Sequence, residues 1–259
     1  MRREGFYMIL NRLGNKKKIA RDIQQLFPTH TYYIEPFFGA GGMFFNKPKA
    51  KYNMVNDLDS EVFNLFNVVS NKKDELSDAF YRMPISEELF KYWMHNKETD
   101  DVKKAVRFIF LSNFSFLGKM DCMTFNNKNA KQNVLDRLQP TFDYLFGVEF
   151  GNKDAVSFIK SISIKDKSKA FVYCDPPYLG TTDNYECGFT EDMSDDLFNC
   201  LCSTGFKFAL SEFDHPFILE QAKQRSLNIE TIGERKNLGN RRVEILVTNY
   251  KNHATLFDL

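Results

Sequence analysis

One stretch of the chain carries most of the information about its fold: Ala170-Phe171-Val172-Tyr173-Cys174-Asp175-Pro176-Pro177-Tyr178. Residues 170–174 form a short apolar run, which is the pattern of a buried strand. The two prolines end that strand, because neither can donate a ladder hydrogen bond. The stretch therefore predicts a carboxylate, a rigid backbone and an aromatic ring at the end of a sheet strand.

The residues after this strand are suited to holding an amino group on a flat heterocycle. The carboxylate of Asp175, together with the backbone carbonyl of Asp175 or Pro176, can accept the two N–H bonds of such a group. The ring of Tyr178 can stack on the heterocycle, while Pro176 and Pro177 keep the backbone rigid. The alternative for the same residues is an ordinary turn after a strand.

A second predicted strand, upstream, runs into a glycine-rich loop: Tyr32-Tyr33-Ile34-Glu35-Pro36-Phe37-Phe38-Gly39-Ala40-Gly41-Gly42. Glycines let a backbone approach a ligand closely, although many such loops are plain tight turns. The loop lacks the dinucleotide fingerprint, because the third glycine of that pattern falls on Phe44. The loop by itself therefore leaves a nucleotide site and a turn open.

The next predicted strand, Tyr52-Asn53-Met54-Val55-Asn56, ends at Asp57. A carboxylate about 20 positions after such glycines suits the hydroxyls of a ribose. The alternative for Asp57 is a helix N-cap or a turn residue. Taken together, the glycine loop and this acid favour a nucleoside-bearing cofactor.

Composition limits the class of protein. The 259 residues are 43% apolar, which is enough for a real core, and 27 Phe predict an aromatic-rich interior. No stretch of about 18 uncharged apolar residues occurs, so no membrane span is expected. Five scattered cysteines and four histidines lack zinc-type spacing, which predicts a reduced, intracellular, metal-free protein. Cys174 is expected to be a buried core residue rather than a nucleophile.

Hydrophobic periodicity divides the chain into three parts. Residues 1 to about 60 supply a helix over Ala20–Phe27 and the first two strands, and residues about 61–147 are mostly helical, with a loop between Ser112 and Gln132. The remaining candidate strands are Val148–Phe150, Phe171–Cys174, Phe206–Leu210, Ile229–Ile232 and Glu244–Asn249. This alternation predicts an α/β fold with a doubly wound, mainly parallel sheet and ligands at the carboxyl ends of its strands.

Several segments resemble, in order, the motifs of one protein family. They are Leu13-Gly14-Asn15-Lys16, Glu35-Pro36-Phe37-Phe38-Gly39-Ala40-Gly41, Asn56-Asp57, Asn152-Lys153-Asp154-Ala155, Asp175-Pro176-Pro177-Tyr178 and Asn240–Tyr250. The chain resembles S-adenosylmethionine-dependent DNA adenine-N6 methyltransferases of the Dam/DpnM-like family, with motifs in the order of the alpha group. It departs from the family's Gly-Gly-Lys motif at Asn15.

The resemblance implies a class I, Rossmann-like methyltransferase fold. Residues 1–60 and 148–259 would form the S-adenosylmethionine-binding catalytic domain, and residues 61–147 a helical insert that recognises the DNA target. The implied cofactor, S-adenosyl-L-methionine, would be held by Lys16, Glu35, Phe37, Gly39, Gly41, Asp57, Asp154 and Asp175. For Lys16 a surface lysine is the alternative, and for Phe37 a core phenylalanine.

The resemblance also assigns Asp175, Pro176, Pro177 and Tyr178 to catalysis on a flipped adenine in double-stranded DNA. The hypothesis is that Asp175 and the Pro176 carbonyl take the N–H bonds of the adenine amine. The nitrogen then attacks the sulfonium methyl directly, and the enzyme contributes positioning and electrostatics.

The net charge of +1 argues against a broad surface that coats nucleic acid, but seven basic residues and two acids lie between Lys103 and Arg137. The residues of this insert expected to contact bases or phosphates are Asn113, Ser115, Lys119, Asn126, Asn127, Lys128 and Arg137. Residues 116–120 depart from the hairpin pattern of family members that read GATC. A different short recognition motif is therefore expected.

Other functions stay open. Cytosine-N4 methyltransferases usually carry Ser where this chain has Asp175, and protein-glutamine and many RNA enzymes carry Asn, so Asp175 favours adenine in DNA. The alternatives are an RNA adenine-N6 or cytosine-N4 methyltransferase and a catalytically inactive nucleic-acid-binding relative. An NAD-dependent oxidoreductase conflicts with the missing glycine fingerprint.

The C-terminal residues suggest one protein partner. Residues 254–259 slightly resemble peptides that dock on bacterial sliding clamps, with a disordered tail as the alternative. A monomer in the cytoplasm of a bacterial or phage-infected bacterial cell is expected. The sequence leaves open whether it serves a restriction-modification system, a phage or a host regulator.

Overall fold

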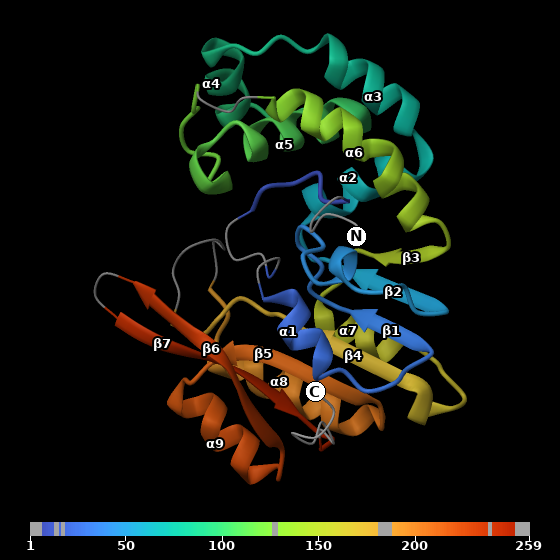
Figure 1. Ribbon diagram of the computed structural model, residues 1–259, viewed down its shortest axis with the longest axis vertical. Coiled ribbons are helices and arrows are strands. Elements are labelled where there is room, and N and C mark those ends of the chain that lie inside the picture. The colour runs from blue at the N-terminus through green and yellow to red at the C-terminus, as the bar shows by residue number, and fades with distance from the viewer. Residues whose placement is uncertain are drawn as a thin grey trace. The chain divides into compact units, whose positions relative to one another are not determined.

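The computed structural model describes residues 7–12, 16, 19–125, 129–180, 188–237 and 240–251, without the side chains of residues 234–237, 240 and 241. The chain divides into two compact units (Figure 1). The first, called here the helical unit, comprises Met1–Lys18, Phe38–Pro48 and Asp57–Asn152. The second, called the sheet unit, comprises Ile19–Phe37, Lys49–Asn56 and Lys153–Leu259.

Within the described residues, seven strands form one sheet in the order β3-β2-β1-β4-β5-β7-β6. They are β1 (Tyr32–Glu35), β2 (Tyr52–Asn56), β3 (Val148–Gly151), β4 (Ala170–Cys174), β5 (Lys207–Phe213), β6 (Asn228–Asn237) and β7 (Asn240–Thr248). β1 runs parallel to β2 and β4, and β4 runs parallel to β5. β7 is antiparallel to both β5 and β6. The predicted α/β fold with a mainly parallel sheet is confirmed, and its last two strands form a long hairpin.

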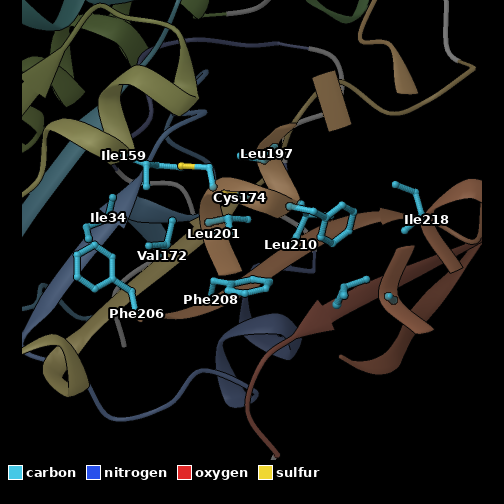
Figure 2. Close-up of a cluster of buried hydrophobic side chains, with 14 of the residues drawn as sticks. Ile34, Ile159, Val172, Cys174, Leu197, Leu201, Phe206, Phe208, Leu210 and Ile218 are labelled. Atoms are coloured by element: carbon cyan, nitrogen blue, oxygen red, sulfur yellow. The ribbon is translucent and has the colours of Figure 1, made fainter. Parts of the chain in front are cut away.

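One face of the sheet in the sheet unit is covered by three helices: α7 (Ala155–Ser161), α8 (Glu191–Thr204) and α9 (Pro216–Gln224). Their apolar side chains meet Ile34, Val172 and Cys174, which alternate along β1 and β4 toward this face (Figure 2). β4 is buried along its whole length. The predictions of a buried strand and of Cys174 as a core residue are therefore confirmed.

The opposite face of the same strands is aromatic. Phe27 follows α1 (Ala20–Gln25), and its ring centre lies 4.6 Å from that of Phe171 and 5.3 Å from that of Tyr173. The helix ends two residues earlier than expected, and Phe27 packs as a loop residue. Both faces of the sheet are covered, as a doubly wound fold requires.

Five α-helices make up most of the described part of the helical unit: α2 (Ser60–Asn71), α3 (Lys73–Arg82), α4 (Glu87–His95), α5 (Asp101–Asn113) and α6 (Ala130–Leu145). α5 is the central one, and its residues from Ala105 to Ser112 are all buried. The prediction that residues 61–147 are mostly helical is confirmed. Short 3-10 turns occur at Phe44–Asn46 and Phe116–Gly118 in this unit, and at Lys167–Lys169 in the sheet unit. No described helix is long and apolar enough to span a membrane.

Candidate functional site

The glycine loop of the helical unit is held in a conformation that needs glycine. Gly39 and Gly41 have positive φ angles of 54° and 71°. A Cβ added at Gly41 would lie 2.5 Å from the ring of Phe45, whereas one added at Gly39 would meet nothing within 4 Å. Gly41 therefore allows the aromatic packing of the loop, and Gly39 presents bare backbone to open space.

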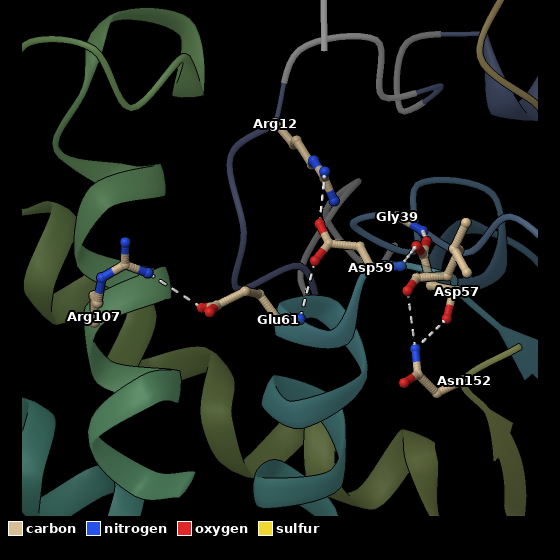
Figure 3. Close-up of polar contacts among 8 residues, drawn as sticks. Arg12, Gly39, Asp57, Asp59, Glu61, Arg107 and Asn152 are labelled. Carbon is tan, nitrogen blue, oxygen red and sulfur yellow. Dashed lines mark hydrogen bonds and ion pairs between the residues drawn. The ribbon is translucent and has the colours of Figure 1, made fainter. Parts of the chain in front are cut away.

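Asp57 ties this loop to the start of α2. Its carboxylate accepts hydrogen bonds from the backbone N–H of Gly39 at 2.6 Å and of Asp59 at 2.9 Å. The N-cap of α2 is Asp59, which accepts from the N–H of Glu61, so the helix-cap alternative for Asp57 is wrong (Figure 3). Burial raises the pKa of the Asp57 carboxyl, although the two N–H bonds and the charge of Arg12 act in the opposite direction.

An ion-pair network extends from this acid pair into the helices. Arg12 contacts Asp59 at 3.0 Å, and Glu61 contacts Arg107 at 3.3 Å (Figure 3). Arg107 also donates from Nε to the backbone carbonyls of Trp93 and Asn96, at 2.9 and 3.0 Å. A carbonyl in the last turn of α4 and the carbonyl of its C-cap residue thus accept from an α5 side chain, and the network fixes the entry to α2.

Lys16 is only 3% exposed in the helical unit, so the surface-lysine alternative is wrong. A buried ammonium is costly unless it has partners, and Lys16 does have interactions in the structure. The neighbouring Leu13, Gly14 and Asn15 of the same motif lie outside the described residues.

In the sheet unit, two motif segments leave the sheet side by side. β1 ends at Glu35 and β4 ends at Cys174, and the two strands are parallel with Ile34 opposite Val172. Asp175 is half-buried and Pro176 is buried at the end of β4. Glu35 is buried and accepts a hydrogen bond of 2.7 Å from the hydroxyl of Tyr33. Carboxylates therefore lie at the carboxyl ends of both strands, where ligands of such sheets bind.

The ring of Tyr178 is fixed from two sides. Its hydroxyl donates to Glu244 on β7 at 2.8 Å, and its ring meets Phe213 edge to face, with centres 4.5 Å apart. The next residue, Leu179, donates its N–H to the buried Glu212 at 3.3 Å. Sequence reasoning missed Glu212, Phe213 and Glu244, although a glutamate inside each of two apolar strands was a visible signal.

The buried hydroxyls of this region stay protonated. Burial raises the pKa of Tyr33, Tyr173 and Tyr178 well above the usual tyrosine range, and nearby carboxylates, including Glu35, Asp175 and Glu244, add to the effect. Burial likewise raises the pKa of the Cys174 thiol. At neutral pH these tyrosines are donors rather than bases, and Cys174 is no thiolate nucleophile.

Two further loops of the sheet unit carry motif residues. Asp154 is the N-cap of α7 and accepts from the N–H of Ser157 at 2.8 Å. Hydrogen bonds from the side chain and from the backbone N–H of Ser157 lower the pKa of its carboxyl. The buried Asn56 donates to the carbonyls of Pro36 and Lys153, at 3.0 and 2.9 Å. Asn56, which was not among the predicted site residues, thereby joins the loop after β1 to the loop before α7.

Phe37 is half-buried, packing on the core of the sheet unit and edge to face against Phe189, with ring centres 6.3 Å apart. The alternative of a core phenylalanine is thus correct for the part of Phe37 that packs on the sheet unit. The rest of its ring is exposed and can contact a ligand.

Three of the predicted DNA-contacting residues form hydrogen bonds with the backbone of the helical unit, and a fourth is exposed. Asn113 donates to the carbonyls of Ile9 and Ile109, the buried Ser115 accepts from the N–H of Met120, and Arg137 donates to the carbonyl of Met8. Lys119 is exposed, beside the exposed Phe116 and Leu117. Asn126, Asn127 and Lys128 lie outside the described residues, as does the tail at 254–259.

No cluster of three or more His, Cys, Asp or Glu side chains suited to a metal ion occurs in the described part of the chain. The polar groups of the candidate site are instead backbone amides, carboxylates and aromatic hydroxyls.

Both groups of candidate residues therefore follow strands of a doubly wound sheet, as in α/β enzymes that bind nucleoside cofactors. The chain belongs to the D12 class N6 adenine-specific DNA methyltransferase family, whose sequence model matches residues 13–236. The family inferred from the motifs and its activity on DNA adenine are thereby confirmed.

Individual relatives of known name share about a quarter of their aligned residues with this chain. The DNA adenine methylase of Escherichia coli (strain K12) is 27% identical over 195 residues, covering 70% of this chain and 69% of that protein. The Type II methyltransferase M1.LlaDCHI of Lactococcus lactis subsp. cremoris is 24% identical over 274 residues, covering 92% and 94%. The solved rRNA methyltransferase aviRa from Streptomyces viridochromogenes has a TM-score of 0.42 at 11% identity, covering 96% and 94%.

Proposed function

We propose that this chain transfers the methyl group of S-adenosyl-L-methionine to N6 of a flipped adenine in double-stranded DNA, at a short recognition sequence. The observation that carries the proposal is the Asp175–Tyr178 segment at the end of β4. There a half-buried carboxylate precedes an aromatic ring that is fixed by Glu244 and Phe213.

The chemistry follows from the weak nucleophilicity of the adenine amine, whose lone pair is delocalised into the ring. Asp175 and the Pro176 carbonyl accept the two N–H bonds and return electron density to the nitrogen. Tyr178 stacks on the base, and Pro176 and Pro177 restrict the backbone that presents the acceptors. Bound S-adenosylmethionine supplies the electrophilic methyl group.

The residues present fit such a cofactor. The open side of Gly39 admits a ligand close to the backbone. Each carboxylate oxygen of Asp57 accepts one backbone N–H and keeps a second lone pair, so it can also accept from a ribose hydroxyl. Lys16 suits the methionine carboxylate, and the carboxylate of Asp154 can accept from the cofactor adenine. Glu35, Phe37 and Gly41 complete the proposed cofactor set.

Fewer residues are proposed to contact DNA than the sequence predicted. A base inside a duplex cannot reach a pocket, so the target adenine is flipped out. We assign target recognition to residues 61–147 and DNA contact to Lys119 with its exposed neighbours. Asn113, Ser115 and Arg137 support this region through hydrogen bonds to the backbone. The recognition sequence, the monomeric state and the sliding-clamp contact stay predictions.

The test is transfer of labelled methyl from S-adenosylmethionine to unmethylated genomic DNA, followed by nucleoside analysis and mapping of modified positions. N6-methyladenine at one short motif supports the proposal and gives the recognition sequence. Label on cytosine, or on RNA offered in parallel, contradicts it. Cofactor binding without transfer to any of these substrates would indicate an inactive relative.

A further inference from the structure

Three side chains of the sheet unit form a row that begins at Tyr178. The ring of Phe213 lies edge to face against the ring of Tyr178, with centres 4.5 Å apart and planes at 81°. The guanidinium carbon of Arg242 lies 5.2 Å from the centre of the same Phe213 ring. One phenylalanine therefore contacts both the aromatic ring assigned to base stacking and a cation.

Strand register explains this row. Phe213 on β5 lies opposite Glu244 on β7 in their antiparallel pairing. Arg242 and Glu244 are two residues apart on β7, so their side chains leave the same face of the strand. Glu244 holds the Tyr178 hydroxyl while Arg242 packs on Phe213. The same face of β7 thus supplies an acceptor for the hydroxyl of Tyr178 and a positive charge beside the ring of Phe213.

Arg242 is available for an anionic ligand. Within the described side chains its recorded contact is the cation–π contact with Phe213, and it forms no ion pair there. A guanidinium that rests on an aromatic ring keeps its N–H groups directed outward, in the planar fork that matches a phosphate. It is half-buried, so part of the group remains accessible.

We propose that Arg242 binds a phosphate next to the flipped nucleotide, and that Phe213 is a positioning residue that sets the spacing between this cation and Tyr178. The inference rests on the proposed function, because a base stacked on Tyr178 brings its own deoxyribose and the flanking phosphates close to this residue. The contact forms only when the adenine is extrahelical. It therefore stabilises the flipped complex and adds one phosphate contact to specific binding at the target site.

The experiment compares wild type with R242Q, R242K, F213L and the charge-loss control K223Q, which changes an exposed lysine on α9. A fluorescent 2-aminopurine at the target position reports flipping, and titrations give the Kd of the cofactor. We expect R242Q to raise KM for DNA about tenfold, to reduce the flipping signal and to lower the salt slope of binding by about one. R242K should retain part of the wild-type DNA affinity, flipping signal and salt slope. F213L should reduce the flipping signal although Arg242 keeps its charge. K223Q should match wild type in all three.

A second arm uses wild-type protein and altered DNA, so it does not depend on how the variants fold. A neutral methylphosphonate replaces each phosphate beside the target adenine in turn. One replacement should weaken flipping in wild type and have no further effect in R242Q. Wild-type flipping by R242Q, or equal losses with K223Q, would overturn the inference. If wild type transfers no methyl group to DNA, the proposed function fails instead, and the two failures are distinguished.

Discussion

The hydroxyl of Tyr178 donates a hydrogen bond of 2.8 Å to Glu244, and the two residues are 9% and 2% exposed. They are 66 positions apart in sequence and meet because β7 lies next to β5 in the sheet. A buried polar group left without its partner costs about 1–3 kcal/mol. The bond therefore fixes the orientation of the ring proposed to stack on adenine.

Glu244→Ala should consequently lower kcat/KM for DNA by about tenfold to a hundredfold, which corresponds to about 1.4–2.8 kcal/mol. Glu244→Gln, which keeps an acceptor, should recover most of the loss. A double-mutant cycle with Tyr178→Phe measures the coupling, using methyl-transfer kinetics and cofactor affinity. Independent, additive losses from the two single changes would contradict the positioning role.

Asp175→Ala should abolish methyl transfer and leave the Kd of S-adenosylmethionine largely unchanged, because the lost carboxylate is proposed to act on the adenine amine. Single-turnover kinetics and calorimetric titration of the cofactor separate the two effects. The matched control is Asp196→Ala, the same change at an exposed site on α8. Wild-type turnover by the Asp175 variant would exclude the proposed mechanism.

Three glycines with positive φ separate strain from ligand contact. Gly39→Ala and Gly147→Ala meet no atoms within 4 Å, so each should cost about 1–2 kcal/mol of stability from the backbone alone. Of these two variants, only Gly39→Ala should also weaken cofactor binding. Gly41→Ala should destabilise more than either, since its Cβ would lie 2.5 Å from Phe45. Urea unfolding and cofactor titration provide the readouts, and equal cofactor affinity for the Gly39 and Gly147 variants would contradict the loop assignment.

Asp154 provides a pH-dependent prediction. Hydrogen bonds from Ser157 lower the pKa of its carboxyl below the usual 3.8, so the charged cap stabilises the fold above that pH. Removing the cap by Asp154→Ala should cost about 1 kcal/mol at pH 7. The difference from wild type should shrink as the pH falls through the lowered pKa. Denaturant unfolding at pH 7 and pH 3 checks this, with Asp154→Asn as a cap that does not titrate; a difference unchanged by pH would count against it.

Arg107 should be the most costly arginine to replace in the helical unit. Arg107→Leu removes the donor to the Trp93 and Asn96 carbonyls and leaves the partly buried Glu61 without this cation. A loss of about 1–3 kcal/mol is expected, because the buried carbonyl of Trp93 loses its donor. Arg82→Ala breaks an exposed pair with Asp78, which solvent screens, so its stability should stay close to that of wild type. Unfolding free energies measure both, and similar losses would refute the ranking.

Much of the fold follows from local sequence pattern. The apolar run and the prolines predicted that β4 ends at Cys174, and helical spacing predicted α2 and α5. The glycine loop and the Asp175–Tyr178 segment were found in the same way. These features depend on neighbouring residues, because backbone conformation and strand termination are set within a few positions.

Hydrogen-bond partners depended on the tertiary structure. The sequence presented Asp57 as a ribose ligand or a helix cap, but only the folded chain made Asp59 the cap and gave Asp57 the N–H of Gly39. The sequence placed Lys16 in a motif, and folding buried it.

The surroundings of Tyr178 show the division most clearly. Its own segment fixed the residue types, whereas Glu244, Phe213 and Arg242 reach it through the antiparallel pairing of β5 with β7. Strand register is settled by long-range packing of whole strands, so no short stretch of sequence specifies which buried acid will meet a given hydroxyl.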